Sequence, residues 1–231
     1  SLGKDDFGYL GLKYKTRLFF NSHKIEHFKK NQCWGGSFQI DDILELIPSV
    51  KDKNILENYI FRKTREIYNK YNYETNLNKL GLEYFNLFLP EIICAHTDKA
   101  NMMESIEARS PFLDNEMIEL AMETPQKYKV NIFRGKILLR DSLKKNRNLE
   151  FIYKKKKKGY TVPMSKYLCG NNDLSNLLND KINQRNNNDL FNYNFVKKIF
   201  DLHKSHKLNY GKEIWNFLML DNWVSQNNLN L

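Results

Sequence analysis

Three stretches of the sequence combine charged residues with glycine, proline or apolar neighbours, and each could build a site for an anion or a metal ion. The first runs from Ser1 to Tyr9 and places Asp5 beside Asp6, with a glycine on either side of the pair. Mg²⁺ takes one or two carboxylates together with phosphate oxygens, so the pair suits a magnesium–phosphate site. The same residues also suit a polar turn, and the pattern leaves both interpretations open.

The second stretch runs from Lys99 to Asp114 and ends in Pro-Phe-Leu-Asp. Apolar neighbours flank Glu107 and Arg109, which predicts that both are partly buried, and partly buried charges must be paired. One interpretation is a structural ion pair that fixes a turn, with Asp114 as the N-cap of the next helix. The other is a pocket wall in which Arg109 or Lys99 faces an anion.

The third stretch is the lysine run Lys154 to Lys158, which leads directly into Gly-Tyr-Thr-Val-Pro. A lysine run alone is typical of a solvated loop. Here the following glycine and proline fix a tight backbone immediately after the charge. A lysine held at such a turn could direct its ammonium at a phosphate leaving group, where it would stabilise the developing charge.

Other familiar sites are missing from the sequence. It contains no GxxxxGK[ST] loop, no GxGxxG between a strand and a helix, and no GxSxG elbow. The pairs His23/His27 and His203/His206 have loose metal-like spacing but lack the companion carboxylate of a zinc enzyme. We therefore interpret them as surface histidines.

The elements that must position these stretches are helices. Apolar residues repeat at helical spacing in six segments, whereas strand patterns are confined to Leu18–Phe20 and Tyr128–Val130. Apolar residues surround most of the last helix, which predicts that it is buried among others. Residues 181–189 are polar and predict a loop. The predicted helices cover residues 43–47, 55–67 (starting near Asp52), 77–90 (ending at Pro90), 116–122, 136–143 and 195–202, followed by the last helix over 214–224.

Composition sets further bounds on the class of protein. The chain has 231 residues, a formal net charge of +10, 41% hydrophobic residues and 13% aromatic residues, which argues against disorder. No apolar run approaches the ~20 residues of a membrane span. The positive charge is concentrated around the lysine run, so we do not expect a nucleic acid partner. Cys33, Cys94 and Cys169 form no CxxC pair, which predicts core thiols and a cytoplasmic protein.

Together these stretches resemble the synthetase domain of the glutamine-hydrolysing asparagine synthetases. That family carries S-G-(D/E)-G-x-D-E-L-F-G-G-Y, then D-R-M-x-M-x-x-x-x-E-x-R-x-P-F-L-D, a G-K-x-x-L-R helix, an R-x-K-K-G-F-x-x-P loop and a final I-W-x-L-L-M-L-E-x-W helix. The counterparts occur here in the same order, as Ser1 to Tyr9, Asp98 to Asp114, Gly135 to Arg140, Lys155 to Pro163 and Ile214 to Trp223.

The resemblance implies a chemistry and a set of site residues. The family uses ATP and Mg²⁺ to adenylate the side-chain carboxylate of aspartate, releasing pyrophosphate, and ammonia then attacks the β-aspartyl-AMP. By motif, Lys157 is the catalytic lysine, and its neighbour Lys158 falls among the residues that bind ATP and pyrophosphate. Ser1, Lys99 and Arg109 complete that binding set. Asp5 and Asp6 match the metal-holding pair, and the divergent first segment leaves open which of them binds Mg²⁺.

The resemblance also implies a fold and a partner. The fold is mainly α, the helical carboxyl-terminal half of an α/β PP-loop ATP pyrophosphatase (adenine-nucleotide α-hydrolase) fold, and residues 1–231 are expected to form one unit. The S-G-G-x-D-S loop and the glutaminase domain are not in this sequence. We therefore expect an amino-terminal half, in cis or in trans, to supply them, and we expect the isolated chain to be inactive. A homodimer is compatible with this.

Two alternative functions fit the same residues. One is a synthetase-like relative that acts on another carboxylate, in lactam, peptide or sugar amidation. The other is a non-catalytic helical module that binds a protein partner. Neither interpretation needs a membrane.

Overall fold

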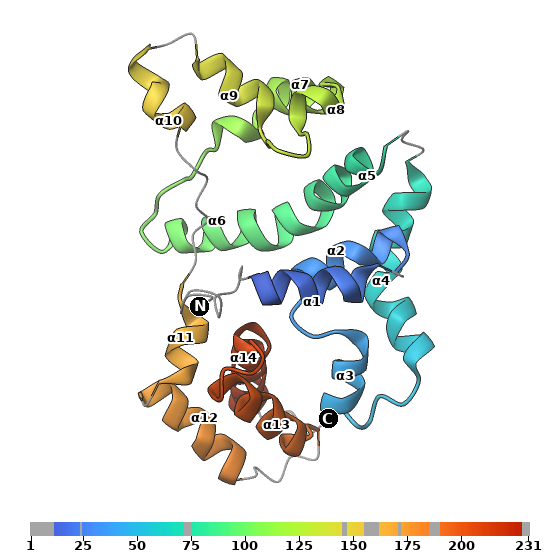
Figure 1. The fold of residues 1–231 in the computed structure, drawn as a ribbon, viewed down its shortest axis with the longest axis vertical. Coiled ribbons are helices and arrows are strands. Elements are labelled where there is room, and N and C mark those ends of the chain that lie inside the picture. Colours follow the sequence, from blue (N-terminus) through green and yellow to red (C-terminus); the bar gives the residue numbers. More distant parts are fainter. Residues whose placement is uncertain are drawn as a thin grey trace. The chain divides into compact units, whose positions relative to one another are not determined.

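The computed structural model describes residues 12–23, 25–71, 75–144, 147–154, 162–170, 172–184 and 190–227 (Figure 1). Within these ranges every regular element is a helix, and the only β feature is an isolated antiparallel bridge between Val130 and Gly135. The prediction of a mainly α fold is therefore confirmed. Both predicted strands are wrong, because Leu18–Phe20 lies inside helix α1 (Leu12–Ser22), while Tyr128 and Lys129 end helix α8 (Gln126–Lys129).

The chain divides into two compact units. Unit 1 comprises Ser1–Glu66 and Thr161–Leu231, and unit 2 comprises Ile67–Tyr160. The expectation that residues 1–231 belong to one domain of the family concerns the domain as a whole and not its compact parts. It stays a prediction. Beside α1, unit 1 contains α2 (His27–Gly35), α3 (Ile40–Leu46), most of α4 (Lys53–Lys70), α11 (Met164–Cys169), α12 (Asp173–Gln184), α13 (Tyr193–Lys204) and α14 (Gly211–Gln226). Beside α8, unit 2 contains α5 (Asn76–Glu83), the π-helix η2 (Tyr84–Cys94), α6 (Ala95–Met102), η3 (Pro111–Leu113), α7 (Asn115–Glu123), α9 (Ile137–Leu143), η4 (Arg147–Leu149) and α10 (Glu150–Lys154).

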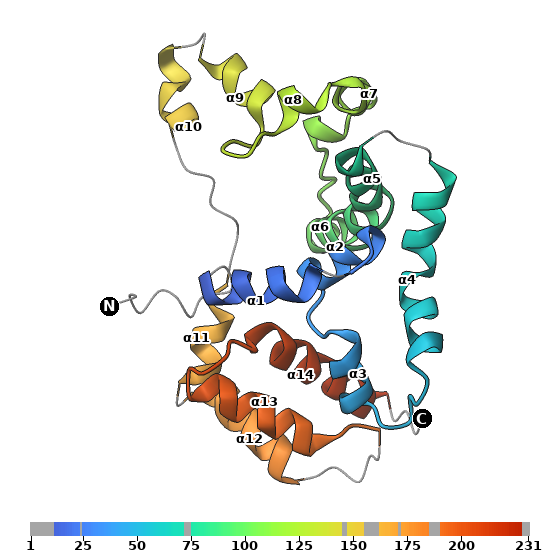
Figure 2. The same ribbon diagram turned by 45° about the vertical axis from the view of Figure 1, so that its right-hand side comes forward.

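The hydrophobic core lies in unit 1, where α11, α12, α13 and α14 pack on one another and α13 also packs on α3 (Figure 2). The ring of Phe217 contacts those of Phe191 and Tyr193 edge to face, with centroids 5.5 and 5.8 Å apart. Helix α3 joins the core through Leu46, whose carbonyl accepts from the backbone N–H of Asn192 at 2.8 Å. The core cluster consists of Leu46, Leu168, Leu178, Ile182, Phe191, Phe195, Val196, Ile199, Phe200, Ile214, Phe217, Leu218 and Val224.

Helix α14 is buried on one side only, in contrast to the prediction of a helix surrounded by others. Phe217 and Leu218 are almost fully buried, whereas Met219 is 46% exposed and Trp223 53% exposed. The close packing is at its amino end. A Cβ at Gly211 would lie 2.5 Å from Ser165 Oγ on α11, so only glycine allows the two helices to approach this far.

Helix α4 begins where the sequence predicts. Asp52 Oδ1 accepts from the backbone N–H groups of Asn54 at 2.8 Å and Ile55 at 3.1 Å, which satisfies the free donors of the first turn. The apolar residues of α4 do not all lie on its buried face. Phe61 is buried against the ring of Phe28, whereas Ile55 and Tyr59 are 69% and 78% exposed.

Two predictions of where a helix ends are wrong. Helix α12 continues to Gln184, so the first half of the predicted 181–189 loop is helical. Pro90 was expected to end a helix over 77–90. Instead the backbone passes through Pro90 as π-helix η2, which connects α5 to α6 without a break (Figure 1). Proline has no N–H to donate and its ring clashes in a regular α-turn, and a wider turn is one way in which a helix accommodates it.

Unit 2 has very little buried apolar surface. Among its described residues only two hydrophobic side chains, Leu82 and Ile137, are buried. The predicted helices over 116–122 and 136–143 are present as α7 and α9. No helix of the described residues is long and apolar enough to cross a membrane.

Candidate functional site

Most of the predicted site residues lie outside the described ranges. Ser1, Asp5 and Asp6 precede residue 12, and Lys157 and Lys158 fall between residues 154 and 162. Their predicted roles in binding ATP, Mg²⁺ and pyrophosphate therefore stay predictions. Within the described residues, no group of three or more His, Cys, Asp or Glu side chains is placed to hold a metal ion.

The two remaining predicted residues lie on the surface of unit 2. Lys99 is an exposed residue of α6. Arg109 donates through Nε to Glu107 Oε1 at 2.9 Å and through a second nitrogen to Glu107 Oε2 at 3.3 Å. The predicted ion pair is thus present. The predicted burial is wrong, because the side chains of Arg109 and Glu107 are 84% and 68% exposed.

The predicted cap of the next helix is only half right. Asp114 occupies the N-cap position of α7, but its side chain makes no capping hydrogen bond. Nor do Lys99 and Arg109 line the apolar groove of unit 2, about 510 Å³ in volume, which lies between α5, η2, η3 and α7 and includes Leu80, Tyr84, Phe85, Phe112 and Met122. Lys99 and Arg109 are therefore exposed residues that lie outside this groove.

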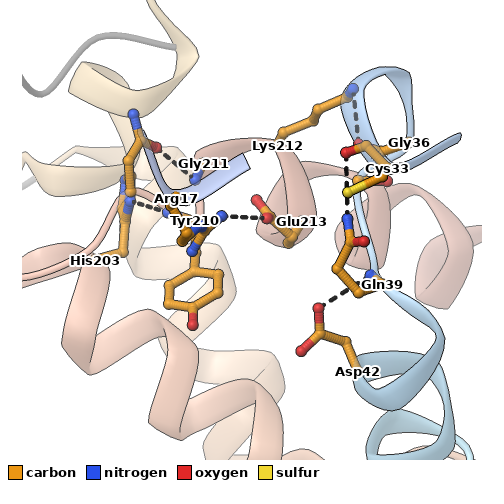
Figure 3. A network of polar contacts seen from close by, with 12 residues as sticks. Arg17, Cys33, Gly36, Gln39, Asp42, His203, Tyr210, Gly211, Lys212 and Glu213 are labelled. Atoms are coloured by element: carbon orange, nitrogen blue, oxygen red, sulfur yellow. Dashed lines mark hydrogen bonds and ion pairs between the residues drawn. The ribbon is translucent and has the colours of Figure 1, made fainter. Parts of the chain in front are cut away.

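The structure instead builds a polar cluster in unit 1, between α1, α3 and the amino end of α14 (Figure 3). Its centre is an ion pair in which Arg17 of α1 donates to Glu213 Oε1 of α14 at 3.2 Å. The guanidinium also lies over the ring of Tyr210, 4.9 Å from its centroid. The carboxylate is the more buried partner, since the Glu213 side chain is 4% exposed and that of Arg17 is 26% exposed.

A cavity of about 660 Å³ borders this ion pair. It lies within unit 1 and is lined by residues of α1, α2, α3, α4 and the start of α14. Apolar side chains such as Leu18 and Phe61 share its wall with charged ones. Lys29 pairs with Glu57 at 2.6 Å, and Lys53 pairs with Asp41 at 2.6 Å. A cavity of this size, with a mixed polar and apolar wall, is in the range that accommodates a small molecule.

Burial dominates the electrostatics of the carboxyl groups in the cluster. Burial raises the pKa of Glu213 to about 7 from an ordinary value of 4.5, against the opposing effects of a backbone hydrogen bond and of Arg17. Burial likewise raises the pKa of Asp42, although the backbone N–H of Gln39 donates to its Oδ2 at 3.0 Å. The cluster therefore contains two carboxyl groups that are easier to protonate than exposed ones.

His203, which the sequence predicts to be a surface histidine, is instead a buried structural residue. His203 is fully buried, and its Nδ1 accepts from the backbone N–H of Tyr210 at 3.0 Å. Its Nε2 lies 3.0 Å from the carbonyl oxygen of Ser165, which assigns the proton to Nε2. Burial lowers the pKa of His203 to about 4, so the ring is neutral and connects α13 to α11 and α14.

Two further contacts attach the loop after α2 to α14. Lys212 Nζ donates to the carbonyl oxygens of Gly35 and Gly36, and burial lowers the pKa of this amine. Cys33 is 4% exposed, which confirms the prediction that it is a core residue, and burial raises the pKa of its thiol. The cluster of Figure 3 therefore joins α1 and α2 to the start of α14, and the beginning of α3 to α2, by polar contacts.

Sequence reasoning missed this cluster because its members are far apart in the chain. Arg17 and Glu213 are separated by 196 positions. A weak signal was present in α14, where Glu213 lies one turn before Phe217 and so places a charge on the face that carries the buried apolar residues. A charged residue on such a face predicts a buried partner, but it does not identify Arg17.

Comparisons with known proteins agree with the motifs. A family model described as asparagine synthase matches residues 13–225. The chain is also similar to asparagine synthetase [glutamine-hydrolyzing] 1 of Bacillus subtilis (strain 168), with 25% identity over 153 residues, which is 66% of this chain and 24% of that protein. The chain thus spans about a quarter of the length of that relative, and no solved structure matches. From the extent of the family match, this chain belongs to the asparagine synthase family.

Proposed function

We propose that this chain is the carboxyl-terminal part of an ATP-dependent carbon–nitrogen ligase that converts aspartate to asparagine. The observation that carries the proposal is the family match over residues 13–225, which extends through both units. The order of the five motif blocks along the chain supports it.

The proposed reaction has two steps. A side-chain carboxylate oxygen of aspartate attacks the α-phosphorus of ATP, the bond to the bridging oxygen breaks, and pyrophosphate leaves. Ammonia then attacks the acyl carbon, AMP leaves with the bonding electrons of the acyl–oxygen bond, and the new amide loses a proton. Each step expels a phosphate-bearing group, so positive charge held beside that group lowers the barrier.

Lys157 is the residue that we propose for this charge. It comes two positions before Gly159, which is the place of the first lysine in the K-K-G-F-x-x-P part of the family's loop. Lys158 and Ser1 are proposed to contact ATP or pyrophosphate, and Asp5 or Asp6 to bind Mg²⁺. Lys99 and Arg109 lie on the surface of unit 2, so either could contact a phosphate only in a site completed by other parts of the protein.

The proposal includes a partner segment that carries the S-G-G-x-D-S loop and a source of ammonia, in cis or in trans. The exposed apolar residues of unit 2 support it, since a large apolar surface is typical of a face that another protein segment covers. Examples are Phe112 at 62% exposure and Ile92 at 53% exposure.

The test is ATP–pyrophosphate exchange by this chain combined with the amino-terminal half that it is proposed to need. Exchange stimulated by aspartate supports the proposal. Exchange stimulated by a different carboxylate would assign the chain to another amidating relative. Absence of exchange with every carboxylate, in a preparation whose two halves associate, would favour the non-catalytic interaction module.

Lys157→Ala gives a sharper test in the same preparation. We expect it to lower the rate of amide formation by an amount equivalent to about 3 kcal/mol of transition-state stabilisation. Lys156→Ala, at the variable position of the loop motif in the same run of lysines, is the matched control and should retain the rate. Equal rates for Lys157→Ala and the unaltered chain would refute the assignment of this lysine.

A further inference from the structure

The carboxyl group of Glu213 is buried with only one of its oxygens satisfied. Oε1 accepts from Arg17, whereas Oε2 has no hydrogen-bond partner among the described residues and is closed to water. A neutral carboxylic acid tolerates such a position far better than a carboxylate does, because the desolvation penalty of an ionised oxygen is much larger.

The charges around Glu213 do not compensate for this burial. Arg17 on α1 and Lys212 on α14 favour the ionised form, whereas Asp42 on α3 disfavours it. Lys212 directs its ammonium to the carbonyl oxygens of Gly35 and Gly36. The neutral groups nearby are Tyr210, under the guanidinium of Arg17, and Cys33. The other ionisable residues of the cavity wall are already in ion pairs with one another: Glu26, Lys29, Asp41, Lys53 and Glu57.

A local movement of α1 would also bring water to Glu213. Its partner Arg17 belongs to α1, and both residues line the cavity of about 660 Å³. A small displacement of α1 from the start of α14 would connect Oε2 to this cavity and hydrate it.

We propose that Glu213 is a proton-controlled latch between α1 and α14. The latch is closed when the carboxyl group is protonated and accepts from Arg17 as a neutral acid. It loosens when the group ionises, because the hydration that Oε2 then gains outweighs the attraction of Arg17. The burial of Oε2 sets the direction in which pH changes the opening of α1. The closed state holds a proton on Glu213 more tightly than an opened, hydrated state does, so a rise in pH favours opening.

The magnitude follows from the pKa of Glu213. Burial raises it to about 7 in the closed state from an ordinary value of 4.5, which a hydrated opened state would approach. Stability from this group is therefore fully present below pH 4.5 and is lost as the pH rises to 7. Between about pH 6 and about pH 8 the opening equilibrium of α1 should increase by up to about tenfold.

The test is amide hydrogen exchange of the full chain, read by mass spectrometry on peptides that cover α1 and corrected for the pH dependence of chemical exchange. We expect the α1 peptides of the unaltered chain to open several-fold more at about pH 8 than at about pH 6. Glu213→Gln keeps the shape of the side chain but cannot ionise, so it should abolish this difference. Glu45→Gln is the matched control, since Glu45 pairs with Lys198 at the surface of unit 1, and it should leave the difference unchanged.

Equal opening of α1 at the two pH values in the unaltered chain would overturn the proposal, and so would the same pH difference in Glu213→Gln. Should Glu213→Gln fail to fold, the ¹³C titration of the Glu213 carboxyl group in the unaltered chain decides. A midpoint near 7 supports the latch, and a midpoint near 4.5 refutes it.

Discussion

Unit 1 and unit 2 are both built from helices, yet they differ in what stabilises those helices. In unit 1, α11 to α14 and α3 share one continuous core of thirteen buried hydrophobic residues. In the described part of unit 2, only Leu82 and Ile137 are buried hydrophobics, and large apolar side chains such as Phe112 and Phe133 face outward. Helices of ordinary length depend on tertiary burial for most of their stability. The described residues of unit 2 therefore stabilise their helices less by burial than those of unit 1 do.

The largest test of this difference is truncation of a buried ring. Phe217 is fully buried and contacts two other rings, so Phe217→Ala should lower the free energy of unfolding by about 3–5 kcal/mol. Phe133→Ala removes the same ring from a side chain that is 92% exposed, and should change it by less than about 0.5 kcal/mol. Urea denaturation followed by circular dichroism measures both. Equal losses would show that unit 2 packs Phe133 in solution.

Glycine to alanine substitutions should change the free energy of unfolding in opposite directions in the two units. In unit 1, Gly211→Ala forces Ser165 and its backbone away from α14, and we expect a loss of about 2 kcal/mol. In unit 2, Gly81 lies within α5 with nothing within 4 Å of an added Cβ, so Gly81→Ala should stabilise the helix by about 0.5–1 kcal/mol. Thermal unfolding of both variants tests the pair. A stabilising Gly211→Ala would contradict the close approach of α11 and α14.

Acid should destabilise unit 1 through a histidine. The pKa of His203 is about 4 in the folded chain and ordinarily 6.5, so the unfolded chain binds the proton more readily. Stability from this residue is present above pH 6.5 and is lost as the pH falls towards 4. The loss should reach about 1–2 kcal/mol near pH 5.

The measurement is the pH dependence of urea unfolding in the Glu213→Gln background, because Glu213 contributes with the opposite sign over an overlapping range. His203→Gln should remove most of the remaining pH dependence of the free energy of unfolding. His96→Gln, at an exposed position of unit 2, is the control and should preserve it. A slope that survives His203→Gln would exclude the buried neutral imidazole.

The smallest expected effect concerns the exposed ion pair of unit 2. Arg109→Ala should leave the stability of the isolated chain unchanged within error, because both side chains are mostly in water. In the combined preparation with an amino-terminal half, the same variant should weaken ATP–pyrophosphate exchange if Arg109 contacts a phosphate there. Unfolding in urea and the exchange assay separate the two roles.

Much of the fold could be predicted from helical periodicity. The spacing around Phe195 and Ile199 predicts α13, and Asp52 predicts the start of α4. Such signals are local: they depend on neighbours within one or two turns. The prediction fails where a distant contact decides, as for Leu18, which a strand pattern suggested but which is buried from a helix. Periodicity likewise does not show that Phe61 of α4 is buried against Phe28 while Tyr59 is exposed.

The site was less predictable than the fold. The motif around Arg109 correctly predicts the ion pair with Glu107, but burial depends on which segments cover that loop, and sequence spacing carries no information about them. The pair of Arg17 and Glu213 shows the same limit, since these residues are 196 positions apart and meet only in the folded unit. Lys157, the central residue of the proposed reaction, rests on its motif alone.

Unit 1 is discontinuous in sequence, and this has a consequence for how the protein is made. Helices α1 and α3 are translated well before their partners, since Glu213 follows Arg17 by 196 positions and Lys198 follows Glu45 by 153 positions. At roughly 5–20 residues per second, the early helices wait for many seconds with their apolar faces uncovered. A nascent chain of this kind is a natural client for chaperones, and loss of α13 and α14 together would remove the residues that α1 and α3 contact.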